Sequence, residues 1–346
     1  MEIEFEAAIL VGHNKPLEIG KIRFENDLAV GQVLVELKVS GICGSQIGEI
    51  DGVKGRDNFI PHLMGHEGCG VIKKIGPGVT TVKEGDKVVL HWKKGSGINS
   101  EVPNYKYRDT KINAGWVTTF NKFAVVSENR VTSIPEKFPS DYAALFGCAV
   151  TTGFGVIENN AKLKIGESIV ILGAGGIGLN IIQAAKLVSA YPIIAVDIFD
   201  ERLELAKKFG ATHLINSRNC EFYDVVKSLL GSNLDVFIDN TGKPEIIEKG
   251  YELINSKGRL VLVGVPKVGS NINIFSLPLH FGKTITGSFG GETHPERDIP
   301  RYMNLMLEGK WSLDGIITER FSLSEINTAI SRIRSGKTIG RVMIDF

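Results

Sequence analysis

The sequence predicts an α/β protein that combines a doubly wound parallel sheet with an all-β region. Three observations support this fold class. A glycine-rich turn follows an apolar run at 168–172, strand and helix patterns alternate from there to about residue 290, and residues 5–130 show strand and turn patterns without a long helix. The pattern changes near residue 145 and returns near 290, which indicates two domains in this chain of 346 residues.

The N-terminal part is expected to form strands and loops. At 33–40 apolar residues alternate with more polar ones, as in a half-buried strand, and further strands are expected at 68–75 and 86–90. Residues 93–115 differ, because they are polar, basic and nearly free of aliphatic side chains. We interpret this segment as a solvated surface lobe; contact with an anionic substrate or with another subunit is the alternative.

Helical patterns begin after residue 139. Ser140 is a plausible N-cap for a helix that starts at Asp141, and a second helix is expected at 152–159. In the alternating region, strands are expected at 168–172, 192–197, 213–215, 234–239, 259–265 and 284–288, with helices at 176–189, 200–209, 221–230 and 244–255. Strands joined by helical crossovers in this way form a doubly wound parallel sheet. Beyond it, helices are expected at 295–309 and 324–335, and a last strand at 340–345.

Three residues punctuate these helices. Asp200 is a plausible N-cap, Gly210 stands where a helix-ending glycine is common, and Pro244 suits a first helical turn.

The chain is organised around the turn after 168–172. Gly173, Gly175 and Gly178 have the G-x-G-x-x-G spacing and lead into a helix whose start includes Gly176. The first glycine permits the tight turn, the second lets the backbone approach a pyrophosphate, and the third lets the helix pack closely on the strand. Backbone N–H groups at the helix start then face the phosphates. The motif predicts a dinucleotide site, against the alternative of an ordinary strand–helix–strand crossover.

An acidic residue ends the next apolar run. Asp197 lies about 20 residues after the last glycine, where a carboxylate can bind the two ribose hydroxyls of NAD. The same carboxylate would repel the 2′-phosphate of NADP, and no Arg or Lys follows until Arg202. We therefore predict that the cofactor is NAD.

Composition argues against several classes of function. The net charge is +1, so nothing marks a nucleic-acid partner. The N-terminus is acidic and unlike a signal peptide, and no apolar run approaches the length of a membrane span. The 4 cysteines are too few and too scattered for a disulfide framework. We expect a cytoplasmic protein with reduced thiols and without a nucleic-acid or membrane partner.

Three separate stretches carry residues that can bind a metal. They contain Cys43, His66 and Cys148, and two thiolates with an imidazole are a natural ligand set for zinc with an open fourth position. Such ligands come from separate elements in catalytic sites, so their wide spacing is acceptable. A lone buried cysteine is usually inert packing, which is our interpretation of Cys69 and Cys220.

These stretches resemble the zinc-dependent medium-chain alcohol dehydrogenases, and the resemblance covers nearly the whole chain. It rests on the dinucleotide fingerprint and on Cys43-Gly44-Ser45, Gly65-His66-Glu67, Cys148 before Thr151-Thr152-Gly153, Val263-Gly264-Val265-Pro266, Gly287-Ser288-Phe289-Gly290-Gly291 and Ser335-Gly336-Lys337. It implies a GroES-like catalytic domain at 1–149, completed by 290–346, and a Rossmann NAD-binding domain at 150–289.

The resemblance also implies roles for individual residues. Cys43, His66 and Cys148 would bind one catalytic zinc, and Glu67 would lie beside the metal and enter its coordination when water leaves. Ser45 would hydrogen-bond the alcohol oxygen. The remaining implied contacts are Trp92 in the substrate pocket; Thr152, Ile177, Val263, Val265 and Phe289 around the nicotinamide half; Arg202 near the adenosine ribose; and Arg341 on the cofactor.

The implied reaction is hydride transfer between NAD and a primary or secondary alcohol, or the corresponding aldehyde or ketone. Zinc would act as a Lewis acid that lowers the pKa of the alcohol, Ser45 would carry the proton away, and the nicotinamide ring would accept the hydride. Because Cys148 stands where polyol dehydrogenases have a glutamate, the site resembles alcohol and glutathione-dependent aldehyde dehydrogenases more closely.

The chain departs from the family pattern at several positions. The lobe at 93–115 lacks the cysteines that hold a structural zinc in many members, so we predict no second zinc. Gln46 replaces the aspartate that usually orients the zinc-binding histidine; an amide can accept the same hydrogen bond but supplies no charge. Gly48 replaces the histidine that often ends the proton relay. Gly340 stands at the position of a common cofactor-binding arginine, next to Arg341.

Other functions remain open at this point. A polyol or sugar dehydrogenase, a zinc-free reductase on the same fold, and a non-catalytic NAD-binding protein are the alternatives. The complete ligand set argues against the zinc-free reductase, and Ser45 argues against a non-catalytic protein. An apolar segment at 272–279, which lacks evident cover, and the resemblance together predict a homo-oligomer, a dimer in the first place, with a tetramer as the alternative.

Overall fold

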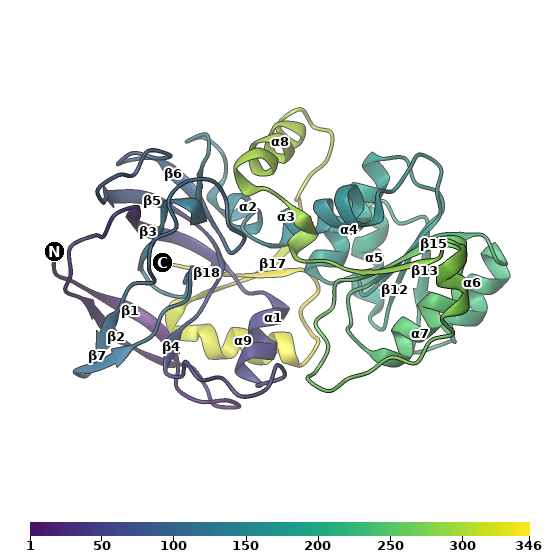
Figure 1. Cartoon of the computed structure of the whole chain (residues 1–346), viewed down its shortest axis with the longest axis horizontal. Helices are drawn as coiled ribbons and strands as arrows, with labels where there is room; N and C mark the ends of the chain where they lie inside the picture. Colours follow the sequence, from purple (N-terminus) through teal and green to yellow (C-terminus); the bar gives the residue numbers. More distant parts are fainter. The chain divides into compact units, whose positions relative to one another are not determined.

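The computed structural model describes the whole chain, Met1–Phe346, which folds into two compact units. Unit 1 comprises Met1–Cys148, His294–Glu308 and Leu313–Phe346, and unit 2 comprises Ala149–Thr293 and Gly309–Ser312. Figure 1 shows the yellow C-terminal segments among the purple and blue strands of the N-terminal part. Unit 1 is therefore assembled from both ends of the chain.

Two β-sheets form unit 1. The smaller sheet has five strands in the order β4-β1-β2-β7-β8, with bounds His62–Leu63, Ile3–Leu10, Glu18–Phe24, Tyr105–Tyr107 and Thr110–Ile112. The larger sheet has seven strands, in the order β10-β6-β5-β3-β18-β17 with β9 also paired to β3. Their bounds are Val131–Ser133, Lys87–His91, Glu67–Ile75, Gln32–Gly41, Arg341–Asp345, Ile317–Ser322 and, for β9, Phe123–Ser127.

Strand β3 is the central strand of the larger sheet. It pairs with β5, β9 and β18, and most of its side chains are buried, including those of Leu34 and Ser40 that the alternating pattern had assigned to a solvated face. Only Lys38 is exposed and only Glu36 is half-buried. More side chains of β3 are buried than the half-buried sequence pattern predicts. Cys43 lies just beyond the C-terminal end of this buried strand.

Short helices complete unit 1. They are α1 (Gly44–Ile50), α2 (Ser140–Leu145), α8 (Pro295–Leu307) and α9 (Ile326–Arg334), with single 3₁₀ turns η1 (Glu128–Arg130) and η5 (Leu323–Glu325). The prediction that Ser140 caps a helix is wrong by one residue, because Pro139 is the N-cap and Ser140 is already helical. Pro139 has an extended backbone, with ψ of 127°, which fits the N-cap position.

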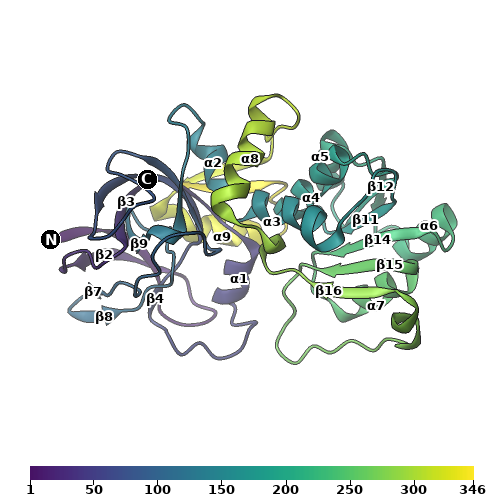
Figure 2. The ribbon, with the colours of Figure 1, turned by 45° about the horizontal axis from the view of Figure 1, so that its top comes forward.

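Unit 2 contains a parallel sheet of six strands in the order β13-β12-β11-β14-β15-β16 (Figure 2). The strands are β11 (Ile169–Leu172), β12 (Ile193–Asp197), β13 (His213–Asn216), β14 (Leu234–Asp239), β15 (Ile254–Leu262) and β16 (Thr284–Gly287). This order, in which the chain moves outward from β11 first to one side and then to the other, confirms the predicted doubly wound α/β class.

The helices of unit 2 are α3 (Ala149–Gly155), α4 (Gly176–Leu187), α5 (Asp200–Phe209), α6 (Phe222–Leu230) and α7 (Pro244–Leu253), with shorter turns η2 (Val156–Ala161), η3 (Leu277–Phe281) and η4 (Gly290–Glu292). The single helix expected at 152–159 is instead α3 followed by the π-helical η2. The N-cap of α5 is Phe199 and not Asp200, which belongs to the first helical turn. Gly210 ends α5 with φ of 122°, a conformation that favours glycine.

Across the described chain, no helix combines the length and the apolar composition needed to cross a membrane.

Candidate metal centre and cofactor site

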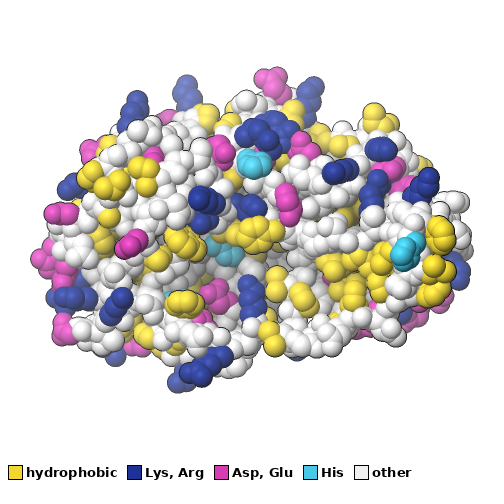
Figure 3. All heavy atoms as spheres, viewed as in Figure 1, with side chains coloured by type: hydrophobic (Ala, Val, Ile, Leu, Met, Phe, Trp, Pro, Cys, Tyr) yellow, Lys and Arg dark blue, Asp and Glu magenta, His cyan; other side chains and the backbone are white.

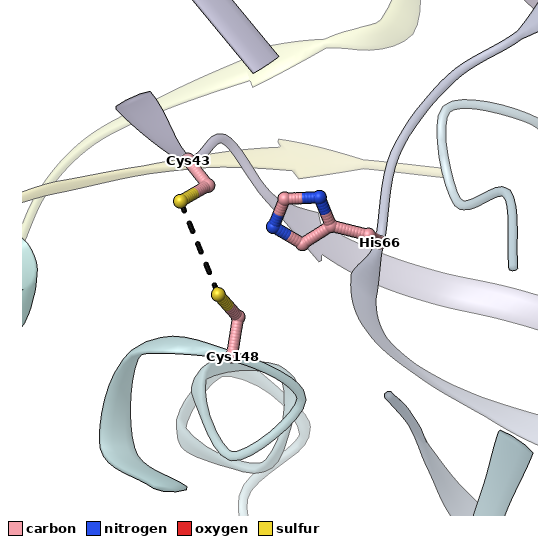
Figure 4. A group of neighbouring side chains, drawn as sticks. All are labelled: Cys43, His66 and Cys148. Carbon is pink, nitrogen blue, oxygen red and sulfur yellow. Dashed lines mark hydrogen bonds between the residues drawn. The ribbon is translucent and has the colours of Figure 1, made fainter. Parts of the chain in front are cut away.

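The three predicted zinc ligands lie together in unit 1. Cys43 follows β3 and precedes α1, His66 directly precedes β5, and Cys148 follows α2. Their donor atoms all lie within 4.8 Å of one another, and the Sγ atoms of Cys43 and Cys148 are 3.9 Å apart. Figure 4 shows the imidazole of His66 facing the two sulfur atoms. Residues that are far apart in the sequence thus form one compact set of donors.

The chemistry of these donors fits zinc. The Nε2 atom of His66 is buried and has no hydrogen-bond partner, so it is an available ligand. A hydrogen bond from the Cys148 thiol holds the pKa of the Cys43 thiol well below its usual value; burial opposes this effect, and His66 and Arg341 support it. Two cysteine sulfurs and one imidazole nitrogen match a zinc site with an open fourth position.

Two glycines that the sequence analysis did not single out make room for this arrangement. A Cβ on Gly147 would lie 2.3 Å from the carbonyl oxygen of Leu90 and 2.9 Å from Cα of Glu67, so a side chain there would displace the segment that carries Cys148. A Cβ on Gly41 would lie 2.5 Å from Oε1 of Glu67. Gly147 is adjacent to Cys148 and Gly41 is separated from Cys43 only by Ile42, and this closeness to predicted ligands is the signal that could have identified both.

The start of α1 holds two more residues of interest. The hydroxyl of Ser45 donates a hydrogen bond over 3.3 Å to Sγ of Cys43, so Ser45 contacts the predicted ligand set. Its side chain is partly exposed. Gln46 is buried, and its amide oxygen accepts a hydrogen bond from the backbone N–H of Cys43 over 2.9 Å. Gln46 therefore hydrogen-bonds to the backbone of Cys43, whereas we expected it to hydrogen-bond to the predicted zinc-binding histidine, His66.

Glu67 and Arg341 form an ion pair within the core of unit 1. The side chains are 0% and 5% exposed, and Arg341 stands at the start of β18, the strand next to β3. Burial lowers the pKa of the Arg341 guanidinium, while the neighbouring Cys43 opposes this shift. In this structure Arg341 thus neutralises Glu67 and adds positive charge beside Cys43; its predicted contact with the cofactor stays a prediction.

The lobe at 93–115 is held without cysteines. The buried carboxylate of Glu128 accepts hydrogen bonds from the backbone N–H groups of Ile98, Thr80 and Thr81 and from the Thr81 hydroxyl, over 2.8–3.0 Å. Burial alone would raise the pKa of Glu128, but these hydrogen bonds outweigh it and the pKa is lowered. One carboxylate therefore joins the lobe to the neighbouring turn.

The basic residues of this lobe are partly neutralised. Arg108 pairs with Glu18 at 2.8 Å, and Lys106 pairs with Glu25 at 2.5 Å, both in the smaller sheet. These pairs favour the interpretation of the lobe as a solvated surface. The predicted substrate-pocket residue Trp92 is half-buried, and the Nζ atom of Lys93 lies 5.8 Å from its ring centroid.

The glycine-rich turn of unit 2 is closed by Asp197. The carboxylate, 6% exposed, accepts a hydrogen bond from the backbone N–H of Ala174 over 2.8 Å, and two more from Ile198 and Phe199. Gly173 has φ of 94°, and a Cβ on Gly178 would lie 1.9 Å from the carbonyl oxygen of Gly173. The first and third glycines of the motif are therefore required by backbone conformation and by close packing.

Two guanidinium groups lie near this acid. Arg202 Nη1 is 3.9 Å from Asp197 Oδ1, and the Arg202 and Arg218 guanidinium groups lie 4.8 and 4.6 Å from the ring centroid of Phe199. Arg218 was not among the predicted cofactor residues. A single arginine after β13 is not enough for the sequence to mark Arg218 as a residue near the cofactor site.

The other predicted cofactor residues are all in unit 2. Thr152 is buried in α3, Ile177 lies in the first turn of α4, and Val263 follows β15. Val265 and Phe289 are 50% and 66% exposed, so their side chains are accessible to a ligand.

One sequence interpretation needs correction. Cys220 was expected to be buried packing, but it is exposed, because it lies in the turn between β13 and α6. Cys69 is buried in β5, and burial raises the pKa of its thiol to about 11, as expected for an inert cysteine.

Comparisons with known proteins agree with this description. Residues 29–136 match the alcohol dehydrogenase GroES-like domain, and residues 176–308 match the zinc-binding dehydrogenase domain. The chain is 30% identical to S-(hydroxymethyl)glutathione dehydrogenase of Paracoccus denitrificans, over 98% of this chain and 99% of the relative. A crystal structure of an alcohol dehydrogenase zinc-binding domain protein from Burkholderia ambifaria superimposes with a TM-score of 0.92 at 27% identity, covering 100% of both chains. Benzyl alcohol dehydrogenase from Acinetobacter calcoaceticus gives a TM-score of 0.89 at 29% identity, covering 99% of both chains.

A Rossmann-type unit joined to a GroES-like unit that carries a cysteine–histidine–cysteine donor set defines a zinc-dependent dehydrogenase. The chain belongs to the zinc-dependent medium-chain alcohol dehydrogenase family, and it is an oxidoreductase that transfers a hydride between an alcohol and a nicotinamide cofactor.

Proposed function

We propose that the protein oxidises a small primary or secondary alcohol, or reduces the corresponding carbonyl compound, with one tightly held zinc and with NAD. The observation that carries this proposal is the group of donor atoms from Cys43, His66 and Cys148 within 4.8 Å. Zinc, when bound, supplies a Lewis acid that lowers the pKa of an alcohol. NAD supplies the hydride acceptor, and the Asp197 carboxylate favours its free ribose hydroxyls over a phosphate.

In this proposal the residues of unit 1 handle charge and protons. Cys43 and Cys148 provide the thiolates and His66 provides a neutral imidazole. Ser45 is the first proton acceptor, because its hydroxyl lies against Sγ of Cys43 and is partly exposed. The structure holds no titratable side chain at Gly48, so in this proposal the proton leaves to solvent beyond Ser45.

The metal assignment is tested by elemental analysis of protein dialysed against a mild chelator. We expect one zinc per chain, and we expect Cys148→Ala to lose both zinc and NADH formation while circular dichroism stays unchanged. Cys69→Ala is the matched control, since this buried cysteine lies outside the donor set, and it should keep zinc and activity. Full activity without zinc, or zinc retention in Cys148→Ala, would contradict the proposal.

The relatives suggest where to look for the substrate. S-(hydroxymethyl)glutathione and benzyl alcohol are the compounds in the names of two similar proteins. A panel that contains both, with aliphatic alcohols and polyols beside them, would identify the substrate class from kcat/KM. We expect an apolar or aromatic alcohol to be preferred over the glutathione adduct, because Arg108 and Lys106 of the basic lobe are already paired with carboxylates.

We also propose that the protein is a homodimer through unit 2. Strand β16 is at the edge of the parallel sheet, and exposed hydrophobic side chains precede it: Val268, Phe275 and Phe281 are 70%, 71% and 68% exposed. Figure 3 shows hydrophobic side chains, in yellow, gathered on the part of the surface at the right of the view. An apolar segment beside an unpaired strand edge is an expected site of association between identical chains.

A further inference from the structure

A second cluster of potential metal ligands lies in unit 1, outside the cysteine–histidine set. It consists of Glu49 on α1, Asp57 in the segment after α1, and His62 on β4. The Nε2 atom of His62 is 2.9 Å from Oδ2 of Asp57 and 3.7 Å from Oε1 of Glu49. One donor atom from each residue lies within 4.8 Å of the others.

The orientation of His62 is fixed from outside this cluster. Its Nδ1 atom lies 2.8 Å from the carbonyl oxygen of Leu63, and the side chain is only 8% exposed. A carbonyl oxygen only accepts, so Nδ1 is the donor in this contact, and the other ring nitrogen, Nε2, points toward the two carboxylates. Histidines that bind metals characteristically donate their other N–H to a backbone carbonyl in this way.

The carboxylates of Glu49 and Asp57 lie within 4.8 Å of each other, and two negative charges at this separation repel unless a positive charge lies close to both. Burial raises the pKa of Asp57, but hydrogen bonds from the backbone N–H of Phe59 and from His62 outweigh this, and the pKa is lowered, so this residue is a carboxylate at neutral pH. His13 adds a further favourable interaction with Asp57. In this structure a hydrogen bond joins Nε2 of His62 to Oδ2 of Asp57, and a bound cation would take the place of its hydrogen between the same atoms.

We propose that Glu49, Asp57 and His62 bind a divalent cation of the zinc type. One imidazole nitrogen and two carboxylate oxygens suit Zn²⁺ or Co²⁺, whereas Ca²⁺ and Mg²⁺ prefer oxygen alone. Two carboxylates neutralise the charge of the ion. Glu49 is 40% exposed, so water can complete the coordination from its side, and the ion exchanges with solvent more readily than a zinc held by two thiolates.

Such an ion would connect α1 to the segment that follows it. Asp57 and His62 belong to the segment that leads from α1 to β4, and Glu49 lies on α1, the helix that begins directly after Cys43. Binding would fix this segment to α1 and stabilise the native state by mass action. The site contains no cysteine and is separate from the lobe at 93–115, for which the sequence predicts no structural zinc.

The test is equilibrium dialysis of the zinc-loaded protein against buffered micromolar Zn²⁺, followed by elemental analysis. The wild type should bind one exchangeable ion per chain beyond the zinc that resists a mild chelator, and its Tm should rise by about 3–8 °C at saturation. His62→Asn and Asp57→Asn should abolish the exchangeable ion and the rise in Tm. His280→Asn, which changes an exposed histidine of unit 2, is the matched control and should keep both.

Two further measurements keep the proposal open to refutation if those variants fold poorly. Glu49→Gln changes a more exposed ligand and should weaken Zn²⁺ binding by more than about tenfold. Even groups that only hydrogen-bond to a metal ligand typically change metal affinity by about 10- to 100-fold. Co²⁺ added to the zinc-loaded protein should give only the weak absorption of nitrogen and oxygen ligands. A wild type without an exchangeable ion, which would mean that a proton fills the site, or an ion that persists in His62→Asn, would overturn the proposal.

Discussion

Ser45 is the residue whose hydroxyl lies against the predicted metal ligands. We expect Ser45→Ala to lower kcat for alcohol oxidation near neutral pH by about 10²–10⁴-fold, because a positioned proton acceptor typically contributes that much. Stopped-flow measurement of NADH formation checks this. Ser45→Thr keeps a hydroxyl and should retain most of the activity. Undiminished oxidation by Ser45→Ala would show that the alcohol proton leaves by another route.

Asp197 accepts hydrogen bonds from the glycine-rich turn, and we propose that the same carboxylate selects NAD over NADP. Asp197→Ala should narrow the preference for NAD over NADP, because it removes the negative charge while Arg202 and Arg218 remain nearby to attract a 2′-phosphate. It should also lower Tm, since backbone N–H groups of Ala174 and Ile198 lose their acceptor. The measurement is kcat/KM with each cofactor.

The control for this experiment is Glu201→Ala, an exposed acid in the first turn of the same helix α5. It removes the same charge without touching the glycine-rich turn and should leave the cofactor preference unchanged. An unchanged preference in Asp197→Ala as well would mean that this carboxylate serves the turn alone.

At the residue scale, the sequence predicts those features that depend on residues close to one another in the chain. The glycine spacing and the terminal acid predict the turn of unit 2, because Gly173 and Gly178 are required by backbone geometry that any such turn shares. The cluster of Glu49, Asp57 and His62 could not be predicted. Its geometry depends on how the segment between α1 and β4 folds back, and no motif encodes that path.

At the scale of elements, the lobe at 93–115 depends on Glu128. We expect Glu128→Gln to lower the free energy of unfolding by about 1–3 kcal/mol at pH 7, because a charged acceptor of several hydrogen bonds becomes a neutral one. The pKa of Glu128 is lowered in the folded state, so its contribution is present above the pKa of the unfolded state and is lost as the pH falls through the folded value.

Thermal unfolding at a series of pH values measures this contribution. The difference in Tm between the wild type and Glu128→Gln should be largest at neutral pH and should vanish in acid. Glu101→Gln, an exposed acid of the same lobe, is the control and should show no pH-dependent difference. A constant difference across the pH range would exclude the charge of Glu128 as the cause.

The boundaries of elements were predicted less well than their existence. All six strands of the parallel sheet were expected, and the agreement is best for β11, β12 and β14, which are largely buried apolar runs. Strand β15 begins at Ile254 and not at 259, because its first residues are mostly polar and form no apolar run. The N-caps of α2 and α5 were each placed one residue late, at Ser140 and Asp200, because Pro139 and Phe199 take the N-cap position without a side-chain hydrogen bond. The anchoring of the lobe by Glu128 was missed, because its partners at Thr80 and Ile98 are distant in sequence.

At the scale of the whole molecule, the assembly proposal gives a direct prediction. Phe275→Ser should convert the proposed dimer to a monomer at micromolar concentration, because it places a polar group in an apolar segment of unit 2. Multi-angle light scattering checks the mass. Phe59→Ser changes an equally exposed phenylalanine of unit 1 and should leave the dimer intact. A monomeric wild type would refute the proposed interface.

Strand β18 has a consequence for how unit 1 folds. It lies between β3 and β17, and it carries the arginine that neutralises Glu67 behind the predicted metal ligands. Pairing β18 with β3 joins residues that are separated by most of the sequence, and such distant pairings form slowly because a long loop must close first. The charge of Glu67 is therefore balanced only after a long-range folding step, and a chain in which β18 has not yet paired leaves this buried acid without its counter-charge.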